Sequence, residues 1–268
     1  MYPASMQSFQ IPSHGAQLNA FVYVAAGAGP HPLVVLLHGF PGNERNLDLA
    51  QDIRRAGWDV LYFDYRGSWG SEGDFSYGHA IEDTAAAVDY VQSRALAKVL
   101  RLDRSRIVLI GHSMGGFMAV QEAAADPRIL GIGLISPADI GGRIPQLLQQ
   151  HHEDAAIKVL NAAYEREGMA PLSGCTPDAL AHETLVHAAQ WSFETKLDAL
   201  RTRPVLVVSS EDAYSRQNQA FASDLRRDGN RRVTAVHLAT DHVYSDQRGA
   251  LSNAILRWLA VVGSPAQH

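Results

Sequence analysis

Two hydrophobic patterns alternate along most of this 268-residue chain. Short runs rich in Leu, Val and Ile are bounded by Gly or Pro, and they alternate with stretches whose apolar residues recur every three or four positions. The first pattern is typical of parallel strands covered on both faces, and the second is typical of amphipathic helices. The apolar runs predict strands over 33–37, 58–63, 106–110, 131–135, 205–209 and 232–238. The other stretches predict helices over 45–56, 79–99, 115–125, 215–228 and 247–261. This alternation predicts an α/β fold with right-handed crossovers.

Two segments break the alternation. The first thirty residues contain two strand-like stretches separated by a turn, which predicts an antiparallel hairpin at the edge of the sheet. Residues 138–200 contain no clear strand pattern and are rich in His, Gln, Glu and Ala, so we expect a helical insertion there. The predicted organisation is a core formed by 1–137 and 201–268, with a helical cap at 138–200.

Composition narrows the class of protein. Apolar residues make up 46% of the chain and charged residues 19%, which is typical of a globular protein with a sizeable core. A net charge of −5 with scattered Arg provides no basic surface for nucleic acid or an anionic membrane, and neither is expected as a partner. No apolar run approaches the length of about 18–20 residues that spans a bilayer. The amino-terminal residues lack the pattern of a secretory signal, so we expect a soluble, cytoplasmic protein.

The clearest chemical motif is the G-x-S-x-G sequence at 111–115, between a predicted strand and a predicted helix. In this context the motif is typical of a nucleophile elbow, in which a serine occupies a tight, strained turn. The turn lifts the hydroxyl above the strand ends and places the amides of the helix N-terminus beside it, where negative charge is favoured. Small residues are needed on both sides of the serine because a larger side chain would clash. We therefore assign Ser113 as the candidate nucleophile.

A serine nucleophile needs a base, and the base needs an orienting group. His242 follows the last predicted strand, and Asp212 follows the strand before it. Both residues are therefore expected at the carboxyl edge of the sheet, where ligands bind in open α/β folds. Glu211 and Asp241 are rival acids, each one residue away from the preferred position. The order nucleophile, acid, histidine is that of a known catalytic triad, and the turn after the strand at 205–209 must bring the acid toward the histidine, which favours Asp212 over Glu211.

The sequence HGFPG at 38–42 directly follows a predicted strand. Its glycine allows the backbone to turn so that the next amide points toward the serine. We expect the backbone N–H groups of Phe40 and Met114 to hold the oxyanion of the reaction intermediate. His38 is expected to anchor this loop by hydrogen bonds.

Together these motifs resemble those of the α/β-hydrolases, in particular the carboxylesterases and the serine aminopeptidase or acylaminoacyl-peptidase-like hydrolases. The resemblance covers nearly the whole chain and is carried by 38–42, 63–73, 111–116, 209–212 and 241–242. It implies a mostly parallel eight-stranded sheet flanked by helices, with a cap between strands six and seven. It also implies that Asp64, Arg66 and Gly67 form a structural turn. Ser209 departs from the glycine that many relatives have before the acid.

Other motifs are not expected to form sites. His182 and His187 are five residues apart, so a helix would place their rings roughly 140° apart, too far for one metal ion. His151 and His152 are adjacent and would point in different directions. The glycine-rich stretch 67–73 does not open a helix, and no P-loop lysine is present. We therefore expect no metal and no cofactor.

The motifs predict a serine hydrolase that acts on small-molecule carboxylic esters through an acyl-enzyme. Two alternatives remain open, namely an amide or peptide hydrolase with the same catalytic groups and a ligand receptor that retains the fold. We expect the cap to cover Ser113 and to favour short or medium acyl chains, with Trp191 and Phe193 as candidate pocket residues.

Overall fold

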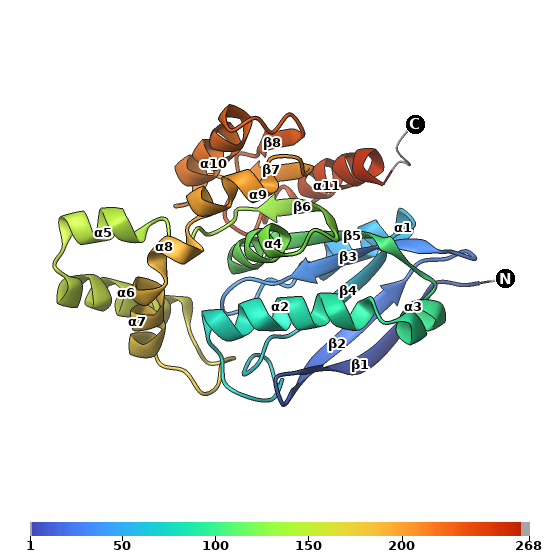
Figure 1. Ribbon diagram of the computed structural model, residues 1–268, viewed down its shortest axis with the longest axis horizontal. Helices are drawn as coiled ribbons and strands as arrows, with labels where there is room; N and C mark the ends of the chain where they lie inside the picture. The colour runs from blue at the N-terminus through green and yellow to red at the C-terminus, as the bar shows by residue number, and fades with distance from the viewer. Residues whose placement is uncertain (1, 264–268) are drawn as a thin grey trace.

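The computed structural model describes residues 2–263, with only the backbone at 94 and 95. Its centre is one eight-stranded sheet with the strand order β1-β2-β4-β3-β5-β6-β7-β8 (Figure 1). The strands are β1 Ser5–Ser13, β2 Ala16–Val24, β3 His31–Leu37, β4 Asp59–Phe63, β5 Leu102–His112, β6 Ile129–Ile135, β7 Val205–Ser209 and β8 Val233–His237. The β1–β2 hairpin and the β2–β4 pair are antiparallel, and all other pairs are parallel. The predicted fold class and the predicted edge hairpin are therefore confirmed.

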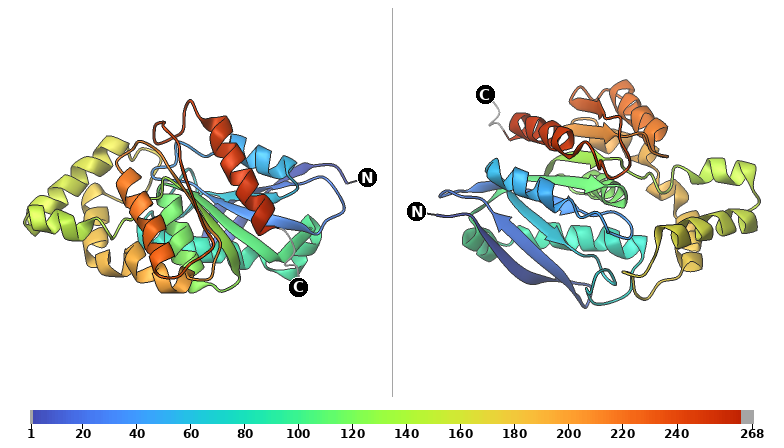
Figure 2. Two further views of the ribbon diagram at one scale, coloured as in Figure 1. Left: turned by 90° about the horizontal axis from the view of Figure 1, so that it is seen from above. Right: turned by 180° about the vertical axis from the view of Figure 1, so that it is seen from behind.

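Helices cover both faces of the sheet. The helices of the core are α1 Leu47–Arg55, α2 Tyr77–Val91, α3 Arg94–Leu100, α4 Met114–Ala125, α10 Ser215–Arg227 and α11 Arg248–Val262. Helices α1 and α11 bury apolar side chains such as Leu49 and Leu251 against one face. Helices α2, α4 and α10 bury residues such as Phe117 and Leu225 on the opposite side, in a larger core (Figure 2). This double layer explains why the central strands are apolar on both faces.

The single helix predicted over 79–99 is wrong, because this segment forms α2 and α3. Helix α2 ends at Val91, and α3 begins after Ser93, whose hydroxyl accepts a hydrogen bond from the Leu96 amide at 3.4 Å. A serine at this position stabilises a new helix start because it satisfies an amide that has no partner within the helix. The apolar spacing continues across the break, which is why the pattern alone did not reveal it.

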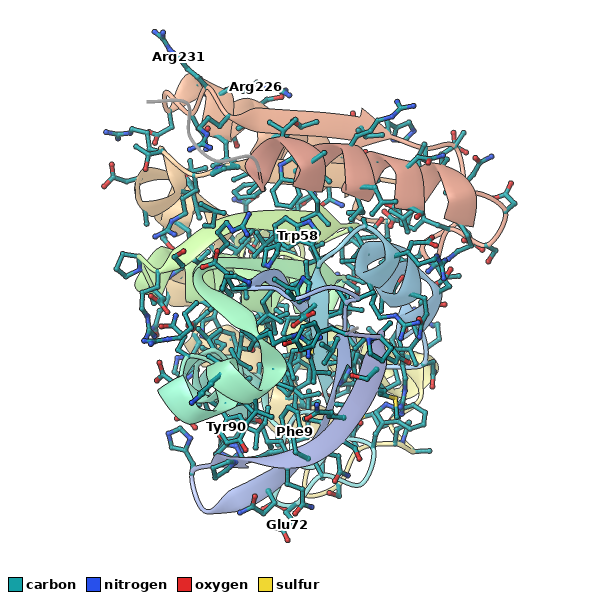
Figure 3. All side chains as sticks on the ribbon, turned by 90° about the vertical axis from the view of Figure 1, so that its right-hand side faces the viewer. Phe9, Trp58, Glu72, Tyr90, Arg226 and Arg231 are labelled. Atoms are coloured by element: carbon teal, nitrogen blue, oxygen red, sulfur yellow. The ribbon has the colours of Figure 1, made fainter. Side chains whose placement is uncertain are left out.

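The outer hairpin packs against α2. Phe9 of β1 stacks on Tyr90 of α2, with ring centroids 5.6 Å apart (Figure 3). This contact covers the inner face of the edge strand. None of the helices in residues 2–263 combines the length and the apolar character that crossing a membrane requires.

Between β6 and β7 the chain forms the predicted helices at one end of the sheet (Figures 1 and 2). They are α5 Ile144–Gln150, α6 Glu153–Glu167, α7 Pro177–Val186, α8 Ala188–Trp191, the 3-10 helix η1 Phe193–Lys196 and α9 Leu197–Leu200. Glu183 of α7 accepts hydrogen bonds from the amides of Tyr77 at 3.0 Å and Gly78 at 2.9 Å. A carboxylate at the N-terminus of α2 is favoured by the helix dipole. This contact fixes the cap over the carboxyl edge of the sheet.

Candidate active site

Ser113 lies in the turn between β5 and α4, with φ 55° and ψ −117°. The turn requires glycine on both sides. A Cβ on Gly111 would lie 2.0 Å from the Gly115 carbonyl oxygen, and a Cβ on Gly115 would lie 2.0 Å from the Leu37 carbonyl oxygen. The backbone therefore adopts the strained strand–turn–helix geometry that the motif predicted.

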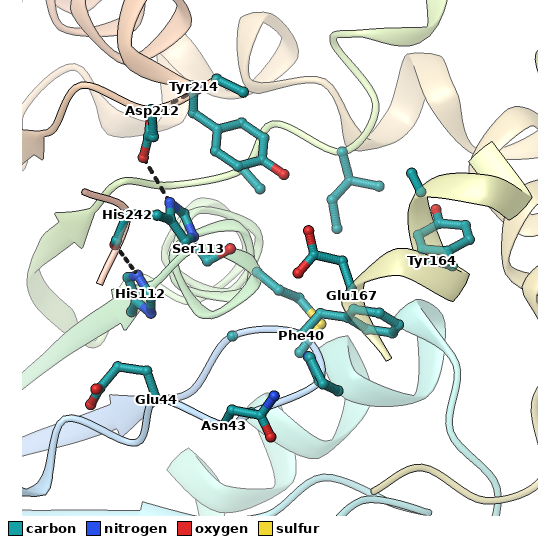
Figure 4. A pocket seen from close by; sticks show the side chains of 18 of the residues that line it. Phe40, Asn43, Glu44, His112, Ser113, Tyr164, Glu167, Asp212, Tyr214 and His242 are labelled. Carbon is teal, nitrogen blue, oxygen red and sulfur yellow. Dashed lines mark hydrogen bonds and ion pairs between the residues drawn. The ribbon is translucent and has the colours of Figure 1, made fainter. Parts of the chain in front are cut away.

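His242 and Asp212 meet at the same edge of the sheet, although 30 residues separate them. The Nδ1 atom of His242 lies 2.7 Å from Oδ2 of Asp212 (Figure 4). Burial alone would raise the pKa of Asp212, but hydrogen bonds from His242, Ser136 and Ser210 lower it to about 2. The carboxylate is therefore ionised, and the His242 Nδ1–H donates to it. This arrangement leaves Nε2 of His242 as the nitrogen available to take a proton.

The rival acids lie elsewhere. Glu211 is exposed, and its amide donates to the Thr240 carbonyl oxygen at 2.9 Å. Asp241 is also exposed, and it accepts hydrogen bonds from the Ser245 amide and hydroxyl at 2.9 and 2.6 Å. The structure therefore pairs His242 with Asp212 and with neither rival acid.

A chain of hydroxyl groups behind Asp212 was not found by sequence analysis. Ser210 donates to Oδ2 of Asp212 at 2.8 Å, and its Oγ lies 2.9 Å from that of Ser136. Ser136 in turn lies 2.9 Å from the Tyr244 hydroxyl. These residues come from three separate loops at the strand ends, so no local sequence signal identifies the chain. The hydrogen bonds hold the carboxylate in place and keep it charged.

His112, next to the nucleophile, supports His242 from the other side. Its Nε2 atom lies 2.8 Å from the His242 carbonyl oxygen, and the two rings lie 4.7 Å apart. Burial lowers the pKa of His112 to about 3, so the ring is neutral and donates from Nε2. This hydrogen bond holds the loop that carries His242.

The loop at 38–42 lies directly against the nucleophile. A Cβ on Gly39 would approach the Ser113 Cβ to 3.1 Å. The residues assigned as oxyanion donors, Phe40 and Met114, line the same cavity as Ser113. The Met114 amide belongs to the first turn of α4, where amides have no partner within the helix. His38 is buried, and its Nδ1 lies 2.8 Å from the Gly39 carbonyl oxygen, which is the anchoring contact expected for it.

The cavity above Ser113 has a volume of about 440 Å³. One wall comes from the core, including Ser113, Asp212 and His242. The other wall comes from the segment 138–143 and from α6, which contributes Ala163, Tyr164 and Glu167. Figure 4 shows Tyr164 and Glu167 across the cavity from His242. The cap therefore forms part of the pocket.

The prediction that Trp191 and Phe193 line the pocket is wrong. Both side chains belong to the cap and are buried, and neither contributes to the cavity wall. Their rings pack against Phe117 of α4, with centroid distances of 5.8 and 6.4 Å. Large aromatic side chains at this junction contribute more by joining two apolar layers than they would by facing a wet pocket.

The histidines His182 and His187 of the cap have separate contacts and do not share a site. His182 is exposed and lies 2.8 Å from the Asp178 carbonyl oxygen, whereas His187 stacks on Trp191 at 4.7 Å. Within residues 2–263, no three His, Cys, Asp or Glu side chains are grouped closely enough to hold a metal ion. The turn at 64–67 is structural, because Arg66 forms an ion pair with buried Asp83 at 2.7 Å.

Comparison with known protein families identifies one whose match spans residues 34–254, which includes the loop at 38–42, the turn with Ser113, Asp212 and His242. The family is described as the alpha/beta hydrolase family. The chain belongs to this family. The match places the elbow, the acid and the histidine of this alpha/beta hydrolase within the family's shared region.

Individual curated relatives match only part of this chain. The chain is 29% identical over 136 residues to a quorum-quenching protein of Acinetobacter baumannii, which covers 48% of this chain and 43% of that protein. It is 31% identical over 164 residues to an sn-1-specific diacylglycerol lipase of Xenopus tropicalis, which covers 59% of this chain and 46% of the lipase. The matches thus span only about half the length of these curated relatives.

Solved structures share the fold over nearly the whole chain. The protein Est1E of Butyrivibrio proteoclasticus with bound ferulic acid superimposes with a TM-score of 0.72 at 19% identity, covering 96% of this chain and 100% of that one. An esterase of Pyrobaculum calidifontis gives a TM-score of 0.70 at 20% identity, covering 97% and 87%. At this level of identity the likeness establishes the fold.

Proposed function

We propose that this alpha/beta hydrolase is a serine esterase that cleaves carboxylic esters of short or medium acyl chains. The observation that carries the proposal is the shared cavity of Ser113, in a strained turn, and His242, whose Nδ1 is bonded to an ionised Asp212. Family membership and the esterase neighbours support a hydrolase.

The proposed reaction has two stages. Ser113 Oγ attacks the ester carbonyl carbon while His242 Nε2 takes the hydroxyl proton, and the Asp212 carboxylate stabilises the resulting imidazolium. The amides of Phe40 and Met114 donate hydrogen bonds to the carbonyl oxygen as it becomes negative. The carbon–oxygen bond to the alcohol then breaks, and His242 returns the proton to the leaving oxygen. Water, deprotonated by His242, attacks the acyl-enzyme and releases the acid.

The volume of the cavity supports the proposed preference for short or medium acyl chains. Pockets for small ligands span about 300–1,000 Å³, and a volume of about 440 Å³ lies in the lower half of this range. Residues of α6 line the cavity opposite Ser113, so a long acyl chain has limited space. Short and medium esters therefore fit this cavity best.

The test is a panel of p-nitrophenyl esters from acetate to palmitate, assayed beside aminoacyl-p-nitroanilides with the same enzyme. We expect turnover of the short and medium esters, no comparable turnover of the anilides, and labelling by a fluorophosphonate that depends on Ser113. Preferential cleavage of the anilides would identify the amide hydrolase alternative. Binding of esters without turnover or labelling would favour the receptor alternative and contradict the proposal.

A further inference from the structure

Arg143 is a half-buried cation on the cap side of the cavity. It lies at the start of α5 and lines the same pocket as Ser113. Among the residues that the structure describes, no carboxylate forms an ion pair with its guanidinium, and its buried Nε atom has no hydrogen-bond partner. The guanidinium bonds to the Tyr164 hydroxyl, and an arginine remains protonated in this setting. The pocket therefore contains a positive charge that forms no ion pair with a carboxylate of the described residues.

Arg66 shows how this protein treats a buried arginine that is only structural. Its Nε lies 2.7 Å from Asp83, and its Nη2 is paired with Glu82. Burying a guanidinium costs free energy unless an anion and further hydrogen bonds compensate it. Arg66 has this compensation from the protein itself. Arg143 has no such ion pair among the described residues, which leaves its charge available to an anion bound in the cavity.

The neighbouring carboxylates do not take this role. Asp139 accepts hydrogen bonds from the amides of Gly142 at 2.8 Å and Phe193 at 3.2 Å, so its oxygens are engaged by the backbone. Glu167 lines the cavity from the exposed end of α6 and does not form an ion pair with Arg143 within the described residues. Both carboxylates would repel a ligand that carries two negative charges. A ligand with a single carboxylate is therefore favoured.

The surroundings of Arg143 suit a carboxylate. The tyrosines Tyr77, Tyr164 and Tyr214 line the same cavity, and burial raises the pKa of Tyr77 and of Tyr214 above the ordinary range. Tyr77 and Tyr214 are therefore neutral and can donate hydrogen bonds to an anion. A guanidinium with neutral donors beside it matches the planar geometry of a carboxylate.

The segment that carries Arg143 is held in place before any ligand binds. The Gly142 amide donates a hydrogen bond to Asp139 Oδ1 and closes a tight turn over 139–142, and a Cβ on Gly142 would lie 2.1 Å from Asp139 Oδ2. A Cβ on Gly141 would lie 2.2 Å from the Ala188 carbonyl oxygen of α8. The turn is thus packed closely against the segment 188–193, which limits the motion of the Arg143 backbone.

We propose that Arg143 binds a carboxylate carried by the substrate, so that the preferred esters are half-esters of dicarboxylic acids or other esters with a free carboxylate on the acyl side. This inference rests on the proposed esterase function. It adds a charge requirement to a pocket whose size alone selects short and medium chains.

The experiment compares matched substrates. Mono-p-nitrophenyl esters of succinic to suberic acid are assayed beside p-nitrophenyl esters of the corresponding unbranched monocarboxylic acids. We expect kcat/KM to be about 10- to 100-fold higher for at least one half-ester than for its neutral partner, which is the effect of a charged hydrogen bond. In Arg143→Gln this ratio should fall to about 1, mainly through KM, and Arg143→Lys should restore part of it.

Arg166→Gln is the matched control, because Arg166 is an exposed arginine on α6 that does not line the cavity. It should leave the ratio unchanged, which separates a local contact from a general effect of positive charge. Far-UV circular dichroism and melting temperature verify that each variant is folded. If Arg143→Gln does not fold, the Lys variant and Arg143→Met provide the comparison.

The outcomes distinguish the two proposals. Turnover of neutral esters with no preference for any half-ester would overturn the role of Arg143 and leave the esterase function intact. If no ester is cleaved, the esterase function fails, and glutarate and adipate are titrated into Ser113→Ala by calorimetry. Binding that Arg143→Gln removes would support the carboxylate site, whereas absent binding, or equal binding of inorganic phosphate, would overturn it.

Discussion

The two walls of the cavity are built in different ways. Ser113, His242 and Asp212 lie at strand ends of the core, where glycines, loop hydrogen bonds and buried hydroxyls hold them. The opposite wall comes from the cap, where α6 and the turn before α5 present Arg143 and Glu167. The core wall contains the groups that the proposed chemistry needs, and the cap wall contains groups that can only select a substrate.

The same contrast appears in two aspartates that line the cavity. Hydrogen bonds from His242 and two serines outweigh burial and lower the pKa of Asp212 to about 2. Burial dominates at Asp139 and raises its pKa to about 6, although two backbone amides bond to it. A carboxyl group on the core wall is therefore kept charged, whereas one on the cap wall titrates near neutral pH. The environment, and not the residue type, sets the role of each carboxyl group.

The largest expected effect is the loss of activity when the nucleophile is removed from the core wall. Ser113→Ala should lower kcat/KM by about 10⁴-fold or more, because no other group in the cavity can form the acyl-enzyme. Loss of one oxygen should leave the melting temperature nearly unchanged. Stopped-assay kinetics and thermal unfolding measure both effects. Retention of more than about 1% of the activity would mean that the nucleophile is another residue.

The second prediction tests whether the buried aromatics of the cap belong to the pocket. Trp191→Ala should lower the free energy of unfolding by about 3–5 kcal/mol, because it opens a cavity beside Phe117. The preferred acyl length should not change, since Trp191 does not line the cavity. Urea unfolding and the ester panel at low temperature provide the measurements.

Ala163→Phe is the matched variant for that test. Ala163 lies on α6 and lines the cavity, so a larger side chain should shorten the preferred acyl chain with little effect on stability. A shift of acyl preference in Trp191→Ala, without one in Ala163→Phe, would reverse the assignment of these two residues.

The third prediction uses the opposite pKa shifts of the two aspartates. Because the pKa of Asp139 is raised from 3.8 to about 6, the folded protein binds this proton more tightly than the unfolded chain does. Ionisation of Asp139 therefore lowers the free energy of unfolding as the pH rises from about 4 to 6. In Asp139→Asn this contribution, roughly 2–3 kcal/mol across the window, should be missing.

Asp212→Asn provides the comparison. The pKa of Asp212 is lowered to about 2, so its contribution to stability is complete above pH 4 and is lost only as the pH falls from about 4 to 2. Its stability curve between pH 4 and 6 should therefore run parallel to that of the wild type. Urea unfolding at several pH values measures the slopes. A parallel curve for Asp139→Asn would show that Asp139 is charged throughout the window.

The smallest effect concerns the hydroxyl chain behind the core wall. Ser210→Ala removes one hydrogen bond to Asp212 and should lower kcat/KM about tenfold, with His242 still bonded to the carboxylate. Ser209→Ala is the control, because its hydroxyl lies 3.0 Å from His237 Nδ1 and does not contact Asp212. Equal losses in the two variants would show that the hydroxyl chain does not support the acid.

The fold and the core wall could be predicted because they depend on local patterns. Continuous apolar runs identify the buried parallel strands, and the glycines at 111 and 115 identify a turn in which any Cβ would clash. The order of Ser113, Asp212 and His242 follows from the strand ends to which they are attached. The break between α2 and α3 was missed because Ser93 interrupts the backbone without interrupting the apolar spacing.

The sequence by itself determined which side chains stand at the carboxyl edge of the sheet, since strand order and short loops place them there. Only the tertiary structure decided how the cap folds back over that edge. It buried Trp191 and Phe193 against α4, brought Ser210, Ser136 and Tyr244 together behind Asp212, and placed Arg143 in the cavity with an Nε that has no partner among the described residues. These contacts join segments that are far apart in the chain. Their formation depends on how whole helices pack, which no local pattern of residues encodes.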